Sequence, residues 1–195
     1  LLLLTLLLPS LGLRAQDDSN VPTNPKPFVI PELTSWTGGR GAYRPIRIVL
    51  GSSSREVKAV AEELAKDYAE MFGRKIQIVK GPRNKGDLLL RLAKPSEDKH
   101  NLGKEGYRLI VGEDAVLEAT HTQGLYWGTR TLLQLSEQDE DQMIPCGTTI
   151  DKPQYAVRGL MLDVGRKYIP MDYLQRLIRV LAYYKMNPLQ LHLND

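Results

Sequence analysis

The feature that most constrains the fold of this chain is a strand–helix–strand pattern over residues 157–193. Residues 157–164 (VRGLMLDV) form an apolar run that is typical of a strand buried on both faces. The stretch after Pro170 carries apolar residues at helical spacing, and residues 189–193 (LQLHL) predict a second strand. Two strands joined by a crossover helix run parallel. Such a unit can open a (β/α)8 barrel, but a whole barrel takes about 250 residues, more than the 195 present.

Residues 28–150 show a different pattern, in which short alternating segments are mixed with two helical ones. Ser54 is placed to cap the first helix and Gly73 to end it, and a second helix is predicted over residues 122–135. Strands are predicted over residues 46–50, 75–79, 87–92, 107–111 and 115–119, the last two as a hairpin. Residues 139–154 carry the polar residues and prolines that are typical of a connector. We therefore predict one α+β domain, a sheet with two helices packed on it, before the parallel unit.

The N-terminal residues are predicted to be a targeting signal. Residues 1–13 are almost wholly apolar, and Ala15 offers a small-residue cleavage point before a polar run. The apolar run breaks at Pro9, short of the roughly 20 residues that span a membrane. We expect a signal peptide at residues 1–15, an extended leader at residues 16–27, no membrane span, and export to the periplasm or the extracellular space. A buried N-terminal helix is the alternative.

Composition narrows the classes of function. The chain is 42% hydrophobic, which excludes disorder over its whole length. The net charge is only +3, and the basic loop at residues 80–85 has no interleaved aromatic residues, so no nucleic-acid partner is expected. Cys146 is the only cysteine, which excludes an internal disulfide and a multi-cysteine zinc site. We interpret it as a buried or inert thiol in the connector, and no pattern indicates a cofactor or a metal.

Candidate ligand-binding residues follow the two strands of the parallel unit. Arg166 comes just after the first strand and Asp195 just after the second. Because ligands bind at the carboxyl ends of parallel strands, which lie about 4.8 Å apart, both side chains are expected to open onto one pocket. The structural alternatives are an exposed ion pair for Arg166 and a helix cap for Asp195. His192 is a candidate ligand contact or a satisfied core histidine, and Asp163 is interpreted as a hydrogen-bonded structural acid.

These residues carry a resemblance to a known family. Residues 155–195 resemble the opening of the catalytic barrel of family-20 glycoside hydrolases, the β-N-acetylhexosaminidases. The family patterns R-G-x-x-L-D-x-x-R and H-x-H-L-x-D are matched by Arg158-Gly159, Leu162-Asp163 and Arg166, and by His192-Leu193 and Asp195. Further similar motifs are EGY at 105–107, GLYWG at 124–128, TLLQL at 131–135, IDKP at 150–153 and KMN at 185–187. The resemblance covers roughly residues 28–195.

The resemblance implies a fold and a chemistry. The implied fold is an α+β accessory domain followed by the first β-α-β of a (β/α)8 TIM barrel, truncated at Asp195. Arg166 is implied to bind hydroxyls of a terminal N-acetylhexosamine, and Asp195, with His192 nearby, to support the active site. The family cleaves such glycans with retention, the acetamido oxygen of the sugar attacking its own anomeric carbon. The implied partners are glycans ending in N-acetylglucosamine or N-acetylgalactosamine, with no cofactor and no metal, and no oligomeric state is predicted.

The catalytic residues themselves are not assigned in this chain. The family's Asp–Glu pair lies on a later barrel strand, so we expect residues 16–195 to be inactive alone. Lys167, Gln190 and Asn194 depart from residues common in the family. Two alternatives stay open: another glycosidase with the same accessory domain, of the α-glucuronidase or O-linked N-acetylglucosamine hydrolase type, or a non-enzymatic glycan-binding module.

Overall fold

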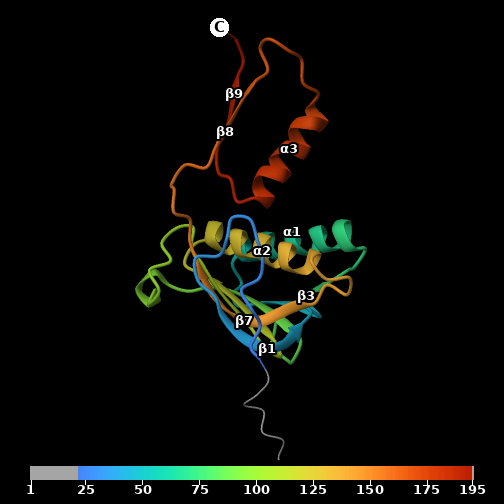
Figure 1. Ribbon diagram of the computed structural model, residues 1–195, viewed down its shortest axis with the longest axis vertical. Coiled ribbons are helices and arrows are strands. Elements are labelled where there is room, and N and C mark those ends of the chain that lie inside the picture. Colours follow the sequence, from blue (N-terminus) through green and yellow to red (C-terminus); the bar gives the residue numbers. More distant parts are fainter. Residues whose placement is uncertain (1–21, 195) are drawn as a thin grey trace, which may run out of the picture.

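The computed structural model describes residues 22–194, which form two stacked parts (Figure 1). The larger part, which we name the sheet domain (residues 22–152), is built on a seven-stranded sheet. The smaller part, the βαβ unit (residues 155–194), holds two strands and one helix. The predicted signal peptide at residues 1–15 and the candidate residue Asp195 lie outside the described residues.

The sheet of the sheet domain is mixed, in the order β1-β7-β5-β6-β4-β2-β3. Its strands are β1 (Thr37–Tyr43), β2 (Arg47–Leu50), β3 (Gln77–Val79), β4 (Asp87–Leu92), β5 (Tyr107–Val111), β6 (Ala115–Ala119) and β7 (Ile144–Asp151). Strands β3, β2, β4 and β6 run parallel, whereas β5 is antiparallel to both β6 and β7. The predicted hairpin is confirmed, with Tyr107 of β5 opposite Ala119 of β6.

Two helices, α1 (Arg55–Phe72) and α2 (Thr122–Glu137), cover one face of this sheet (Figure 1). The Ser54 hydroxyl caps α1 as predicted, accepting hydrogen bonds from the backbone N–H groups of Glu56 and Val57 at 3.2 and 3.5 Å. Gly73 ends the helix at a φ of 64°, a left-handed conformation that glycine adopts without strain. A single 3₁₀ turn, η2 (Pro95–Glu97), precedes β5.

Helix α2 lies unusually close to the sheet. A Cβ atom at Gly124 would collide with the backbone carbonyl oxygen of Gly106, which leads into β5. The close approach seals the core, in which Leu64, Leu117 and Leu125 are fully buried. It also holds Thr131 of α2 within hydrogen-bond distance of the Tyr107 hydroxyl, at 2.6 Å.

The predicted connector at residues 139–154 is wrong, because residues 144–151 form strand β7. This strand lies between β1 and β5 and pairs with both. The polar residues of β7 are more typical of a connector than of a buried strand. Thr149 is nevertheless buried, because its hydroxyl donates a hydrogen bond to the backbone oxygen of Ser35 at 2.7 Å and so stays paired. Pro145 pairs with β1, where the register is irregular. Cys146 therefore lies in a strand of the sheet.

The βαβ unit contains β8 (Leu160–Asp163), α3 (Met171–Tyr183) and β9 (Leu189–His192). The two strands are parallel, as predicted, with Leu160 opposite Leu189. The expected burial of the first strand on both faces is not observed, since Met161 is 59% exposed. Among the described residues β8 pairs only with β9, so little shields its side chains.

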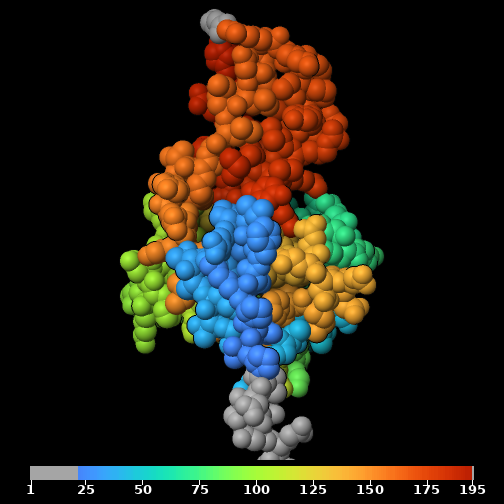
Figure 2. Space-filling model, in the orientation of Figure 1, coloured from blue at the N-terminus to red at the C-terminus, as the bar shows by residue number. Residues whose placement is uncertain are grey.

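The βαβ unit stands as a lobe on the helical face of the sheet domain (Figure 1). Figure 2 shows the first described residues, from 22 on and coloured blue, lying against the base of that lobe. Gln134 of α2 links the two parts: its side chain exchanges hydrogen bonds with the backbone of Ile30 and donates to the backbone carbonyl oxygen of Tyr183 at 3.0 Å. Within residues 22–194, no helix has both the length and the apolar character that a membrane span needs.

Candidate functional site

The predicted binding residues lie at the carboxyl ends of β8 and β9. Asp163 and His192 are register partners on the two parallel strands and end them at the same edge. The His192 carbonyl oxygen accepts hydrogen bonds from the backbone N–H groups of Val164 and Gly165 at 2.9 and 3.1 Å. The chain therefore turns immediately after β8, which brings Arg166 to this edge.

Asp163 orders the turn that carries Arg166. Its Oδ1 atom accepts hydrogen bonds from the backbone N–H groups of Gly165 and Arg166 at 3.0 and 3.2 Å. Its Oδ2 atom lies 3.6 Å from Nε of Arg166. The interpretation of Asp163 as a hydrogen-bonded structural acid agrees with this geometry. The Arg166 side chain is 75% exposed, and a guanidinium carries N–H donors in a fixed geometry that suits hydroxyl oxygens.

The remaining parts of the predicted site are only partly described. His192 is half-buried at the end of β9. Asp195 is not among the described residues, so a shared pocket for Arg166 and Asp195 stays a prediction.

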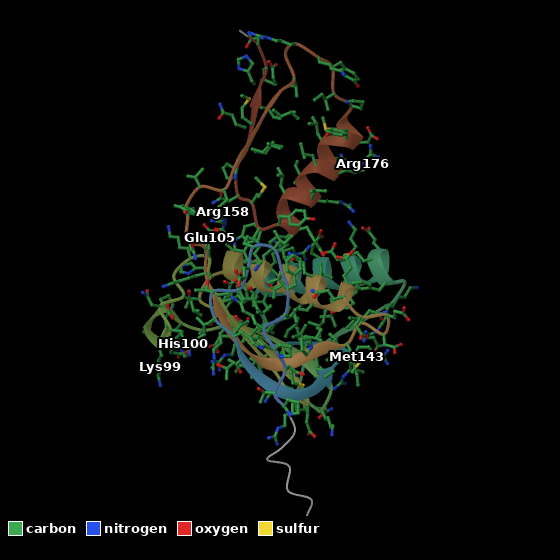
Figure 3. All side chains as sticks on the ribbon, viewed as in Figure 1. Lys99, His100, Glu105, Met143, Arg158 and Arg176 are labelled. Atoms are coloured by element: carbon green, nitrogen blue, oxygen red, sulfur yellow. The ribbon has the colours of Figure 1, made fainter. Side chains whose placement is uncertain are left out.

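A second cluster, which the sequence analysis missed as a site, lies at the opposite ends of the same strands. A cavity of about 330 Å³ opens where the βαβ unit meets the sheet domain, and its lining includes Glu105, Trp127, Tyr155, Arg158 and Lys185. Figure 3 shows Glu105 of the sheet domain and Arg158 of the βαβ unit side by side at this junction, where they form an ion pair. Trp127 donates from its ring nitrogen to the same carboxylate at 2.9 Å.

A buried ion pair forms part of the lining of this cavity. Lys185 lies 3.1 Å from Asp151 and donates to the Tyr107 hydroxyl at 3.0 Å. Burial alone raises the pKa of Asp151, but the Lys185 charge and hydrogen bonds from Tyr107 and Thr34 outweigh it and lower the pKa. Burial lowers the pKa of Lys185, although Asp151 opposes this change. Both ion pairs, Lys185–Asp151 and Arg158–Glu105, join the βαβ unit to the sheet domain, so the cluster is a polar contact between the two parts.

One feature of the sequence, the placement of charged residues beside apolar strands, indicates this cluster, although hydrophobic periodicity does not. Lys185 and Arg158 are charges placed next to apolar strands, and Glu105 and Asp151 are acids at the ends of buried ones. Such charges need partners when the strands are buried. Their pairing is between residues 34 and 53 positions apart, which no local pattern reveals.

The other candidate residues have structural surroundings. Cys146 is buried, its thiol lies 3.6 Å from the Gly112 carbonyl oxygen, and burial raises the pKa of that thiol. An inert thiol fits this environment. Trp127 is buried, and Trp36 and Tyr126 pack against the hydrophobic core.

Comparison with known proteins identifies two sequence profiles along the chain. The profile of glycosyl hydrolase family 20, domain 2, matches residues 26–152, and that of the glycosyl hydrolase family 20 catalytic domain matches residues 155–195. The β-N-acetylhexosaminidase of Cellulomonas fimi is 36% identical over 151 residues, which make up 76% of this chain and 30% of that protein. The lacto-N-biosidase of Bifidobacterium bifidum is 30% identical over 169 residues, 83% of this chain and 14% of that protein.

Solved structures agree with these relatives. The Streptomyces plicatus N-acetyl-β-hexosaminidase superimposes with a TM-score of 0.75 at 33% identity, covering 90% of this chain and 36% of that one. The present chain thus spans about a third or less of the length of the relatives named.

Proposed function

The chain belongs to glycosyl hydrolase family 20, and from this premise we propose that its whole protein is a β-N-acetylhexosaminidase. The enzyme removes terminal N-acetylglucosamine or N-acetylgalactosamine from glycans. The observation that carries the proposal is the pair of family profiles, in order, over an α+β domain and a parallel βαβ unit. In this proposal the βαβ unit is the first β-α-β of a (β/α)8 barrel.

Arg166 is the sugar-binding residue of this proposal. It follows β8 at the edge where barrel enzymes bind their substrates. Its exposed guanidinium carries fixed donors suited to hydroxyl oxygens, and the Asp163 turn holds its backbone. Asp195 would support the same site, with His192 beside it on β9.

The reaction proceeds by retention with help from the substrate. The acetamido oxygen of the bound sugar forms a bond to the anomeric carbon while the bond to the leaving oxygen breaks, and a carboxylic acid protonates that oxygen. Water then opens the cyclic intermediate and restores the acetamido group. We place the Asp–Glu pair that assists these steps in the family on a later strand of the barrel, so we propose that residues 16–195 alone are inactive and that the whole protein is exported.

The test compares the full-length protein with residues 16–195 on a chromogenic N-acetyl-β-glucosaminide. We expect turnover only by the full-length protein, and no turnover of the matching glucoside, because that sugar lacks the acetamido nucleophile. Arg166→Met should raise KM strongly, whereas Arg176→Met, on the exposed side of α3, should leave KM unchanged. Hydrolysis of the glucoside at a similar rate would contradict the substrate-assisted mechanism.

Lacto-N-biosidase activity is a second candidate function, because the relative of that name aligns over 83% of this chain. A chromogenic lacto-N-bioside assayed beside the N-acetylglucosaminide distinguishes the two. Exclusive cleavage of the lacto-N-bioside would replace the hexosaminidase proposal with this activity.

A further inference from the structure

Lys185 has an unusual position for a lysine. It lies in the turn between α3 and β9, has a positive φ of 58°, and its side chain is 8% exposed. A non-glycine residue in this conformation is strained, and a buried ammonium group loses its hydration. Both costs are offset only if the Lys185 ammonium group makes strong interactions at its buried position.

The Lys185 ammonium group contacts Tyr107 and Asp151, which both belong to the sheet domain. Tyr107 of β5 and Asp151 of β7 face each other in the sheet and share a 2.7 Å hydrogen bond. Thr131 lies 2.6 Å from the same tyrosine hydroxyl, and Thr34 donates to the other carboxylate oxygen at 2.8 Å. Every polar atom of this acceptor site is therefore held by the sheet domain itself.

Arg158 supplies a second anchor that is joined to the first. It lies two residues before β8, pairs with Glu105, and stands 5.9 Å from the centre of the Trp127 ring (Figure 3). Its Nε atom donates to the Lys185 carbonyl oxygen at 2.9 Å. The segments that lead into β8 and β9 are thus tied to each other and to the sheet domain.

We propose that Lys185 is a positioning residue, which locks the N-terminal ends of β8 and β9 onto the sheet domain through the Asp151–Tyr107 acceptor site. The role of Lys185 as an anchor stands on the contacts alone. Its consequence for catalysis rests on the proposed hexosaminidase function, because Arg166 lies at the far ends of the same strands.

The strands act as a lever between the anchor and Arg166. Five residues separate Arg158 from Asp163, or about 16 Å at about 3.3 Å per residue. A rotation of about 4° at the anchor then moves the far end by about 1 Å. Misplacement of a substrate-binding group by about 1 Å can slow an enzyme about 100-fold.

The contact between Arg179 of α3 and Glu70 of α1 provides a matched control. It also joins the βαβ unit to the sheet domain, at 2.8 Å, but both side chains are about half exposed. Exposed ion pairs contribute little. Lys185→Met and Arg179→Met therefore each remove one cation that bridges the two parts, one buried and one exposed.

The first experiment measures hydrogen exchange along the 195-residue chain. For Lys185→Met we expect exchange of the β8 and β9 amides to rise at least tenfold, with the β5–β6 amides still protected. Arg179→Met should match the parent chain. Equal exchange in Lys185→Met and the parent would overturn the proposal, and so would loss of protection in both parts together, which indicates a general stability role.

A milder variant covers the case in which Lys185→Met fails to fold. Tyr107→Phe keeps the ring and removes only the hydroxyl that Lys185 contacts. Exchange of the β8 and β9 amides should therefore rise, but by less than in Lys185→Met. In a Trp36→Phe background the emission comes from Trp127 alone. Its quenching by acrylamide should rise in Tyr107→Phe, and unchanged quenching together with unchanged exchange would refute the anchor.

The second experiment uses the full-length protein. Displacement of Arg166 should raise KM and lower kcat/KM at least tenfold in Lys185→Met, with partial rescue by Lys185→Arg and no change in Arg179→Met. A merely unstable enzyme would lose kcat at constant KM, which would contradict positioning. If the parent protein has no hexosaminidase activity, the proposed function fails, whereas the exchange result still decides the anchor.

Discussion

The sheet domain and the βαβ unit have similarly apolar strands but close their cores to different extents. Leu117 in β6 is fully buried, whereas Leu191 in β9 is 40% exposed. Strand β6 has a paired neighbour on both sides and α2 above it, whereas within residues 22–194 β9 pairs only with β8. The difference shows that an apolar strand becomes a core strand only when its sheet and its covering layer are complete.

The helices repeat this difference. Helix α2 buries most of its residues against the sheet, while α3 buries only Leu181 and leaves Met171 and Ile178 exposed. The βαβ unit is therefore held mainly by its contacts with the sheet domain at the base of the lobe. Its exposed apolar side chains are a site where the 195-residue chain should self-associate.

The largest expected contrast is between two leucine-to-alanine substitutions. Leu117→Ala should lower the free energy of unfolding by about 2–5 kcal/mol, because it leaves a cavity in a closed core. Leu191→Ala should lower it by less than about 1 kcal/mol. Urea unfolding followed by tryptophan emission tests this, since both tryptophans, Trp36 and Trp127, lie in the sheet domain. Equal losses in the two variants would contradict the contrast.

The close packing of α2 on the sheet predicts the next effect. Gly124→Ala gains about 1 kcal/mol in helix propensity, but its Cβ meets the backbone of Gly106. We expect a net loss of about 1–3 kcal/mol, as for overpacked cores. Gly112→Ala is the control, because its Cβ would have no neighbour nearer than 3.8 Å. Thermal unfolding of both variants measures the difference, and a stabilised Gly124→Ala would show that α2 can shift.

The Asp151 carboxylate, at the junction of the two parts, is expected to make a contribution to the free energy of unfolding that depends on pH. Its pKa is lowered in the folded chain, so its stabilisation is complete above the ordinary value of about 3.8 and is lost as the pH falls through the lowered pKa. Asp87 and Asp98 also have lowered pKa values and titrate over this range. Comparison with Asp151→Asn isolates one group: the stability gap between the two proteins should narrow as the pH falls below 3.8. A gap that stays constant would mean that the Asp151 charge contributes nothing.

The smallest expected effect concerns the cap of α1. Ser54→Ala removes the hydroxyl that accepts from Glu56 and Val57 and should lower the free energy of unfolding by about 1 kcal/mol. Ser53→Ala, at an exposed neighbouring position, should change it by less than about 0.5 kcal/mol. In the βαβ unit, by contrast, helix α3 begins at Met171, and its N-cap residue Pro170 makes no side-chain cap hydrogen bond. Circular dichroism during urea unfolding gives both values.

Sequence reasoning located most elements of both parts. It placed the hairpin at residues 107–111 and 115–119 and the crossover helix after Pro170, and the structure confirms both. It mistook β7 for a connector and did not foresee β1. Both strands are rich in glycine, threonine or exposed positions, and they become strands because β1 pairs with β7 and β7 also pairs with β5.

The candidate site likewise has one part that local sequence predicts and one part that only the tertiary structure reveals. The turn that places Arg166 after β8 follows from its position in the sequence, and Asp163 orders it through bonds spanning two and three residues. The cluster of Lys185, Asp151 and Tyr107 was not foreseen as a site, because its members come from three separate elements. Only the register of β5 on β7 and the docking of the α3–β9 turn bring them together.

Local sequence thus predicts the Ser54 and Gly73 caps of α1 and the alternating strands, because these depend on residues close together along the chain. The parallel order of β8 and β9 follows from the helix that joins them. The tertiary structure decided which strands are covered, which polar residues form β7, and where Lys185 is buried. The burial of Lys185 depends on partners 34 and 78 positions away in the sequence. The free energy of a buried charge is set by such partners rather than by its neighbours in sequence.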